Sequence, residues 1–517
     1  MTAPIILRGG TIVDGTGASP RQADLRIEGA AVTGIGRLPQ RPSEVEVNAT
    51  GRLIMPGFID AHSHADGQVF SPEVQLALLR QGVTTIVTGQ DGVSYGPAHG
   101  AAAAWSASYF AGINGPLPQV WSDGVTWAEL RRSLTGAVRV NTAHLLPHGT
   151  LRYQVAGLSP ELDRSQRHGL MELVAQGLAD GAVGLSTGLH YVPGLYADVD
   201  ELSQIGGLLA EAGRPYVTHM RGYEDESVVG LGEVHQIAAT SGVAVHVSHL
   251  HGPASLLTRL MDDAADDGVD LTFDSYPYLR GFSLLTIPLL PAELLTLAPG
   301  NLVDALSSPG TAGDVRRHWE ASDYAAFDKA TIANAPGFEA AEGLTLRAAA
   351  EQAGNELDSF AIELLRATGG AVTAVFEQPP TNSEADMRAL LQHEGHLGGS
   401  DGIFVGGHPH PRARGTFARF LGHHVRELGD WTWTQAAEHL AARPAERFGL
   451  GNRGILREGA AADVLLIDPS RVTDRATYAE PTLLSEGIED VWVGGEQVLH
   501  EGTLTAALPG RALTWDY

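Results

Sequence analysis

The sequence predicts an α/β protein with a TIM-like (β/α)8 barrel, a small β-sandwich formed by both termini and an inserted subdomain. Three observations predict this: short apolar runs alternate with amphipathic helical stretches in the middle of the chain, strand-and-turn patterns occupy both ends, and one stretch breaks the alternation. We expect the sandwich at 1–55 plus 447–517, the barrel at 56–446 and the insertion at 281–345.

The two ends of the chain carry short alternating runs separated by glycine-rich turns. Such runs occur at 5–7, 11–13, 25–27 and 31–33, and again at 463–467 and 491–493. Neither end offers enough strands for a core of its own. We therefore expect the ends to share one small domain, with two separate β-caps as the alternative.

The middle of the chain repeats a strand–helix pattern over nearly 400 residues. Apolar runs at 84–87, 182–185, 216–218, 243–247 and 271–273 alternate with helical stretches such as 161–176 and 199–212. This repetition indicates a parallel sheet, and the length suits an eight-fold barrel. A doubly wound sheet is the alternative, but no glycine-rich phosphate loop opens an early helix. The stretch 281–345 is rich in proline and leucine and is expected to leave the barrel after a strand.

Composition excludes several classes of function. With 61 acidic and 34 basic residues, the net charge of −27 makes nucleic-acid binding unlikely to be the role of this chain. The absence of cysteine excludes disulfides and thiolate metal ligands, so His, Asp, Glu or backbone must hold any metal. No signal peptide or membrane-spanning window is visible, and we expect a soluble, cytoplasmic protein with no membrane partner.

The strongest motif is PGFIDAHSHAD, which places His62 and His64 two residues apart after an apolar run. Residues two apart on a strand point to the same side, so two imidazoles there can hold one divalent ion. Paired histidines also occur on surfaces with other partners. The preceding strand and Pro-Gly turn favour the metal-binding interpretation.

Two further histidines and two aspartates occupy equivalent positions at predicted strand ends. His219 and His249 each close an apolar run, and in a parallel barrel such ends meet at one mouth. Each alone is more often a structural residue. Asp91 and Asp401 lie beside glycines, where a turn is the ordinary explanation. In this set, Asp91 can ligate a metal and Asp401 can act as general base and acid.

The motifs and their order resemble the amidohydrolase superfamily and, within it, the D-aminoacylase (N-acyl-D-amino-acid deacylase) group. The resemblance covers nearly the whole chain outside the insertion. It is carried by GGTIVDGTG, PGFIDAHSHAD, GVTTIVTG, LSTGLHYVPGLYA, VTHMRGYED, VHVSHLHG, FDSYPY, GGSDG, HPHPRARGTFARFLG, RPAERFGL and RGILREGAAADVLLIDP. It implies the same barrel and terminal β-sandwich that the pattern of elements predicts.

The resemblance also implies roles for individual residues. Asp401 matches the catalytic aspartate, and Arg412 the arginine that binds the substrate's α-carboxylate. Tyr191 and Tyr278 match substrate-pocket positions, although core packing explains either equally well. The matched metal ligands are His62, His64, His219 and His249.

Two positions depart from the group. Asp91 stands where these deacylases carry a cysteine ligand, and His251 where they tend to carry lysine. The chain's only lysine, Lys329, falls in the expected insertion and is a poor candidate for a carboxylated bridge. We expect one or two Zn²⁺ ions, with Mn²⁺ or Co²⁺ as alternatives because Asp91 is a harder donor. His251 is an expected substrate contact.

The predicted function is metal-dependent hydrolysis of a carbon–nitrogen bond other than a peptide bond. The substrate is expected to be a small carboxylate-bearing amide, an N-acyl amino acid, with the D configuration implied by the resemblance alone. Hydrolysis of a cyclic amide or imide, or hydrolytic deamination, would use the same site. A non-catalytic binding relative is the third hypothesis, because a usual ligand is replaced. The sequence leaves open whether the chain forms a homo-oligomer.

Overall fold

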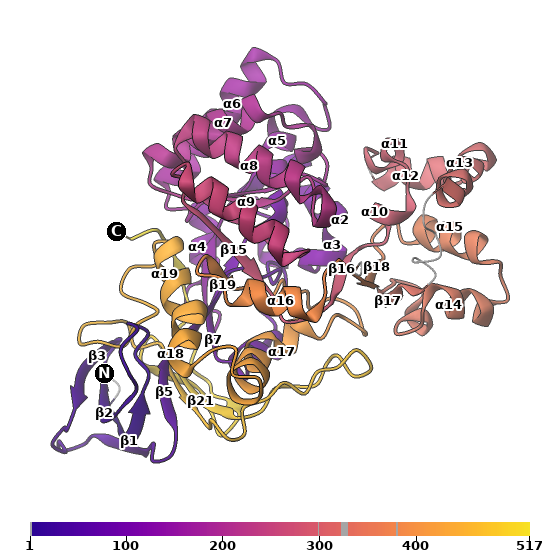
Figure 1. The fold of residues 1–517 in the computed structure, drawn as a ribbon. Coiled ribbons are helices and arrows are strands. Elements are labelled where there is room, and N and C mark those ends of the chain that lie inside the picture. Colours follow the sequence, from indigo (N-terminus) through magenta and orange to yellow (C-terminus); the bar gives the residue numbers. More distant parts are fainter. Residues whose placement is uncertain (1–2, 298, 322–328, 379–380, 517) are drawn as a thin grey trace.

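The computed structural model describes residues 3–297, 299–321, 329–378 and 381–516. Its centre is a parallel barrel, which confirms the predicted fold class (Figure 1). The barrel closes where the Ala61 amide donates to the Gly398 carbonyl at 3.0 Å. Its strands are β6 (Phe58–Asp60), β7 (Val83–Thr88), β10 (Asn141–His144) with β11 (Leu146–Pro147), β12 (Leu185–Gly188), β13 (Tyr216–His219), β14 (Val245–Val247), β15 (Leu271–Ser275) and β19 (His396–Gly398).

Amphipathic helices cover the outside of the barrel. In α6, for example, Leu170, Val174 and Leu178 recur every four residues and are buried against the strands. Asp163 caps this helix in a capping box with Gln166. The outer helices are α1 (Pro72–Leu79), α4 (Trp127–Leu134), α6 (Arg164–Ala179), α7 (Val199–Glu211), α8 (Ser227–Ser241), α9 (Ala254–Asp266), α16 (Glu384–Leu391) and α17 (Arg412–Arg419).

The observed strands agree with the predicted apolar runs, with shifts at their starts. The run 182–185 enters β12 only at Leu185. Before that point Val183 bonds to the His144 carbonyl, and a Cβ at Gly184 would lie 2.7 Å from the Pro215 carbonyl. The backbone there is packed too closely for regular pairing, although the segment is as buried as a strand. Residues 182–184 are apolar because they are buried, although regular strand pairing begins only at Leu185.

Strands from both termini join in one nine-stranded sheet beside the barrel (Figure 1). The junction is the antiparallel pair β20–β5, in which Leu465 lies opposite Met55. Two separate β-caps are therefore excluded. The strands are β1 (Ile5–Ile12), β2 (Arg21–Glu28), β3 (Ala31–Gly36), β4 (Val45–Asn48), β5 (Leu53–Pro56), β20 (Val464–Ile467), β21 (Ile488–Val493), β22 (Glu496–His500) and β23 (Thr503–Leu504).

A separate unit follows β15 and stands apart from the barrel in Figure 1. Its sheet has the order β16 (Arg280–Leu284), β18 (Thr373–Glu377), β17 (Thr331–Asn334). Because β18 is the central strand, the unit extends beyond residue 345, and we place its end at Glu377. Its helices are α10 (Thr286–Leu289), α11 (Ala292–Leu295), α12 (Pro299–Leu306), α13 (Pro309–Ala321), α14 (Leu346–Ala353) and α15 (Leu357–Ala367).

The barrel interior is filled by apolar side chains from several strands, neighbouring ones included. Ile59, Val87, Val217 and Leu397 belong to one buried cluster, which also includes Phe448, the residue after the last helix. This core leaves the carboxyl ends of the strands as the place where polar side chains can gather. Among the described residues, no helix is both long and apolar enough to cross a bilayer.

Candidate active site

The polar side chains singled out in the sequence all follow barrel strands at one end. His62 and His64 come two and four residues after β6, and His219 is the last residue of β13. Parallel strands present these ends to a common mouth. The others are Asp91 after β7, His249 after β14 and Asp401 after β19.

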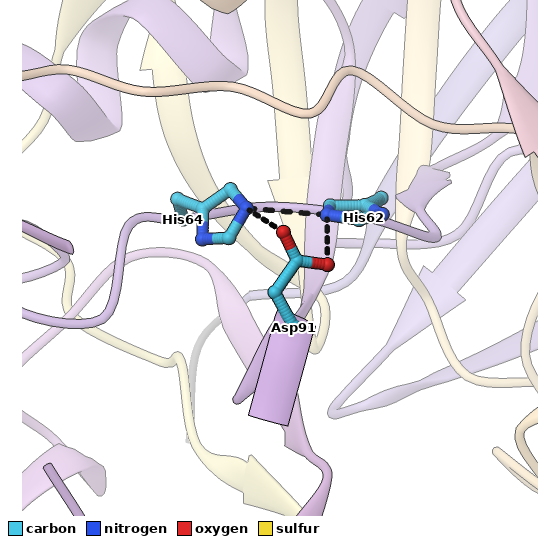
Figure 2. Close-up of side chains that lie close together, drawn as sticks. All are labelled: His62, His64 and Asp91. Carbon is cyan, nitrogen blue, oxygen red and sulfur yellow. Dashed lines mark hydrogen bonds and ion pairs between the residues drawn. The ribbon is translucent and has the colours of Figure 1, made fainter. Parts of the chain in front are cut away.

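His62, His64 and Asp91 form the first group of potential metal ligands (Figure 2). The Nε2 atoms of the two histidines lie 3.2 Å apart. One Asp91 oxygen lies 3.7 Å from His62 Nε2 and the other 3.6 Å from His64 Nε2. All three side chains are buried. One imidazole pair and one carboxylate therefore face a common point.

Asp91 also belongs to a second group, with His219 and His249. His219 Nδ1 lies 3.6 Å from Asp91 Oδ2, and His249 Nε2 lies 3.9 Å from Asp91 Oδ1. The ligand atoms within each group lie within 4.8 Å of one another, close enough to share an ion. Asp91 is the member common to both groups.

The backbone at this mouth is held in an unusual conformation. Asp91, His249 and Asp401 have φ angles of 54°, 36° and 47°, in the left-handed region that costs a residue with a Cβ roughly 1–2 kcal/mol. Asp91 lies between Gly89 and Gly92, and a Cβ at Gly89 would lie 2.4 Å from the Leu145 carbonyl. The glycines let the loop turn sharply against its neighbour. The strained residues are those that carry the polar side chains.

Asp401 connects the ligand groups to a buried arginine. Its Oδ1 lies 3.4 Å from His64 Nε2, and its Oδ2 lies 2.7 Å from Arg412 Nη2. The Nε of Arg412 also donates to the Asp401 backbone carbonyl at 2.7 Å. The guanidinium stacks over Tyr276, with its central carbon 4.5 Å from the ring centroid. Arg412 is completely buried at this position.

The carboxylates make the mouth strongly favourable for positive charge. Burial alone would lower the pKa of His64, but Asp401 and Asp91 raise it to about 10. Burial opposes ionisation of Asp401, yet Arg412 and His64 bring its pKa down to about 2. The pKa of Asp91 is held well below its usual range by the neighbouring His219 in spite of burial. Ionised carboxylates surrounded by imidazoles create a negative potential that favours binding of a cation.

Buried partners orient two of the ligand imidazoles. Asp274 lies 3.3 Å from His62 Nδ1 and accepts from the His249 amide at 2.9 Å. Asn114 Oδ1 lies 2.9 Å from His64 Nδ1. In both histidines Nδ1 is engaged and Nε2 faces the site, which is how ring orientation is set around metals.

A cavity of about 220 Å³ opens over the ligand groups. Tyr191 and His251, two of the predicted substrate contacts, line this cavity. Tyr278 does not: it borders two neighbouring cavities and packs on His410, while Tyr276 lines the cavity in its place. The apolar part of the lining consists of Ile113, Tyr191, Tyr223, Tyr276, Phe282 and Ile403.

Sequence reasoning missed several residues of this site. His190 and Asp274 lie inside motifs already singled out, LSTGLHYVPGLYA and FDSYPY, so attention to their polar members could have found them. Asn114 is the last residue of the short helix α3 (Ala111–Asn114), and Phe282 lies on β16 of the inserted unit. No local pattern marks them, because only the tertiary fold brings them to the cavity.

The site lies at the mouth of a parallel barrel and combines two buried groups of His and Asp ligands with a further aspartate, Asp401. Together these features define a metal-dependent hydrolase. The chain belongs to the amidohydrolase family, whose model matches residues 45–499. It is a metal-dependent amidohydrolase that acts on carbon–nitrogen bonds other than peptide bonds.

Several relatives match this chain over nearly its full length. A D-aminoacylase of Alcaligenes xylosoxydans xylosoxydans is 30% identical and covers 98% of this chain and 97% of its own. An N-acyl-D-glutamate deacylase from the same organism is 32% identical over 99% of this chain and 96% of its own. The N-acyl-D-glutamate deacylase of Bordetella bronchiseptica, solved with zinc and a phosphonate inhibitor, superposes with a TM-score of 0.81 at 30% identity, covering 99% and 100% of the chains.

Proposed function

We propose that the protein is an N-acyl-D-amino-acid deacylase, which hydrolyses the amide bond to release a carboxylate and a free amino acid. The observation that carries this is the position of Asp401, 3.4 Å from the ligand His64 and 2.7 Å from the buried Arg412. One carboxylate thus lies between a metal centre and a cation suited to a substrate carboxylate. The names of the full-length relatives support the substrate class and its D configuration.

The donor set fits a divalent cation. Asp91 Oδ1 is buried and forms no hydrogen bond with any described residue, so an acceptor remains for a metal. When bound, a divalent cation would supply a water whose pKa is lowered towards ~7 and would polarise the acyl carbonyl. The residues that would hold it are His62, His64, Asp91, His219 and His249.

Asp91 bears on both the number and the identity of the ions that the site would hold. Because this carboxylate belongs to both ligand groups, the site has room for two ions, which would be held by His62 and His64 and by His219 and His249, each pair together with Asp91. Zinc suits imidazole ligands and is present in the Bordetella deacylase structure. A carboxylate in place of a thiolate is a harder donor, so Mn²⁺ or Co²⁺ would compete better here than at a cysteine site.

Asp401 would move the proton in the reaction. Its carboxylate accepts a proton from the attacking water as the new carbon–oxygen bond forms. It then gives that proton to the amide nitrogen as the carbon–nitrogen bond breaks, so the amino acid leaves as a neutral amine. Its low pKa keeps Asp401 ionised, and therefore able to accept, throughout the neutral range.

Arg412 would bind the substrate's α-carboxylate. Its Nη1 is buried and forms no hydrogen bond with a described residue, so one donor is left for a ligand. The guanidinium lies behind Asp401 and Tyr276 and does not itself line the cavity. We therefore expect substrate binding to shift one of these two side chains. The other polar contact to the substrate would come from His251.

The cavity favours a neutral amino-acid side chain. Among the described residues, no arginine or lysine lines it. Glu224 lies 3.5 Å from Nε2 of His251, a lining residue, and adds negative charge on that side of the cavity. A second carboxylate, as in N-acyl-D-glutamate, would find no cation of its own and would be repelled. Side chains such as those of leucine or methionine suit the tyrosine-rich lining.

The cyclic-amide alternative has less support. A dihydropyrimidinase from Brevibacillus agri has a TM-score of 0.60 at 15% identity, which shows the shared fold alone. The adenine deaminase of Listeria monocytogenes matches over only 17% of this chain. The buried guanidinium next to Asp401 favours a substrate with a free carboxylate.

The test is a turnover screen of the zinc-loaded protein. N-acetyl-D-leucine and its L enantiomer would be compared with hydantoin, dihydrouracil and adenine, and metal content would be measured on the same sample. We expect turnover of the D-amide and little of the L-amide. Turnover restricted to the cyclic compounds or to adenine would overturn the proposal, as would a chain that retains no metal.

A further inference from the structure

His190 lies between the ligand His219 and the backbone of the following loop. Its Nδ1 is 3.1 Å from His219 Nε2, and its Nε2 is 2.7 Å from the Arg221 carbonyl. The His190 and His219 rings meet edge to face, with centroids 5.0 Å apart and planes at 70°. His190 follows β12 directly and also lines the cavity.

The carbonyl of Arg221 fixes the direction of both hydrogen bonds. A carbonyl only accepts, so His190 must carry its proton on Nε2. A neutral ring then has Nδ1 as an acceptor, and His219 must donate from Nε2. This leaves the lone pair of His219 on Nδ1, the atom that lies 3.6 Å from Asp91 Oδ2. The same atom lies 2.9 Å from Nε2 of His249, so the lone pair of His219 faces the group of atoms that would bind a cation.

The anchor of this chain of bonds is itself held in place. The Arg221 guanidinium donates to the Leu195 and Ala197 carbonyls at 2.7 and 2.6 Å and pairs with Glu233. The Leu189 amide donates to the His219 carbonyl at 3.0 Å. The loop after β12 is thus tied to the end of β13 on both sides of His190.

We propose that His190 is a positioning residue for the metal centre, which selects the His219 tautomer whose Nδ1 binds the ion. This rests on the metal-dependent function proposed above. His190 would give His219 a hydrogen-bond partner on the ring nitrogen that is turned away from the ligand group. Asp274 provides such a partner for His62, and Asn114 provides one for His64. Second partners of this kind typically change metal affinity by ~10–100-fold when removed.

Three substitutions separate this role from simple packing. His190→Asn keeps an acceptor close to the position of Nδ1, His190→Gln keeps a donor close to Nε2 but no acceptor towards His219, and His190→Phe keeps only the shape. The zinc-loaded full chain would be titrated with a competing chelator to measure the zinc dissociation constant. His168→Phe, at an exposed histidine on α6, is the matched control. Thermal unfolding of each metal-free chain checks folding.

We expect the Phe and Gln variants to bind zinc ~10–100-fold more weakly than wild type, and the Asn variant and the control to stay within ~3-fold. Wild-type affinity in His190→Phe would overturn the proposal. Equal losses of zinc affinity in the Asn and Gln variants would also overturn it, since the acceptor towards His219 would then have no role. The comparison of Asn with Gln still tests the proposal if the Phe variant does not fold. A wild-type chain that retains no zinc would instead overturn the metal-dependent function.

Discussion

Arg412 holds Asp401 at two points, with Nη2 2.7 Å from its carboxylate and Nε donating to its backbone carbonyl at 2.7 Å. The same guanidinium that lowers the pKa of the proposed proton carrier is thus the proposed anchor for the substrate carboxylate. With these proposed roles, substrate binding and proton transfer would be coupled through one side chain. Activity should respond to substitutions of this pair in two distinguishable ways.

Replacing Asp401 with Asn should remove turnover without removing the metal. The amide cannot accept a proton from water, and general base catalysis of this kind contributes ~100–10,000-fold. We expect kcat to fall by ~1,000-fold or more while zinc content stays at the wild-type value. Deacylation assays with elemental analysis check this. An Asn variant with near wild-type kcat would remove Asp401 from the mechanism.

Replacing Arg412 with Lys should raise KM for the N-acyl amino acid by ~10–100-fold, because lysine lacks the planar fork that binds a carboxylate at two points. The carboxamide analogue of the substrate is the control, since it carries no charge for Arg412 to bind. The wild-type preference for the acid over the carboxamide should shrink in the variant. If kcat falls equally for both substrates, Arg412 acts through Asp401 and not on the substrate.

Asp91 should be indispensable for metal binding and replaceable by cysteine. Asp91→Ala removes the one side chain common to both ligand groups, so we expect metal content to drop to less than half. Asp91→Cys supplies a softer anionic ligand and should retain zinc while losing affinity for Mn²⁺ relative to Zn²⁺. Competition titrations with both ions check this. An unchanged Zn²⁺ to Mn²⁺ preference in Asp91→Cys would show that this residue does not touch the ion.

The charge of the cavity should set side-chain preference. We expect kcat/KM for N-acetyl-D-leucine to exceed that for N-acetyl-D-glutamate by ~10-fold or more, because an unpaired buried carboxylate is costly. Phe282→Arg, which places a cation on the lining, should reduce this ratio. The Phe282→Leu variant controls for loss of the ring. A wild-type enzyme that prefers the glutamate derivative would contradict this assignment of the cavity.

Acid should destabilise the fold through His439, away from the site. Burial and the positive charge of Arg443, whose Nη1 lies 3.2 Å from Nε2 of His439, together lower the pKa of His439 to about 3. The unfolded chain binds a proton near pH 6.5 and the folded chain does not, so stability is complete above pH 6.5 and declines as pH falls towards 3.

The contribution of this histidine should be on the order of 1–3 kcal/mol between pH 7 and 4.5. Urea unfolding at both pH values measures it in wild type and in His439→Asn, which keeps a donor for the His396 carbonyl. The variant should be less stable at pH 7 but lose less on acidification. Equal losses in both chains would mean that other groups carry the acid sensitivity.

Much of the architecture could be predicted because it depends on local patterns. Period-two and period-3.6 apolar spacing indicated the strands and helices, and the barrel follows from their order. His62 and His64 were recognisable because their spacing, two residues apart directly after one strand, already places them together. His219 and His249 needed only the further rule that parallel strand ends meet at one mouth.

Tertiary structure decided what no local pattern encodes. Tyr276 and not Tyr278 faces the cavity because a tight turn follows β15, in which the Tyr278 amide donates to the Tyr276 carbonyl at 2.9 Å, so the same-side rule for residues two apart on a strand no longer holds. The contact between His190 and His219 joins loops from different strands. By itself the sequence determined the fold class and the residue types able to hold a metal. Which nitrogen, oxygen or guanidinium atoms face one another was decided by packing, because such contacts form between segments that only the closed barrel brings together.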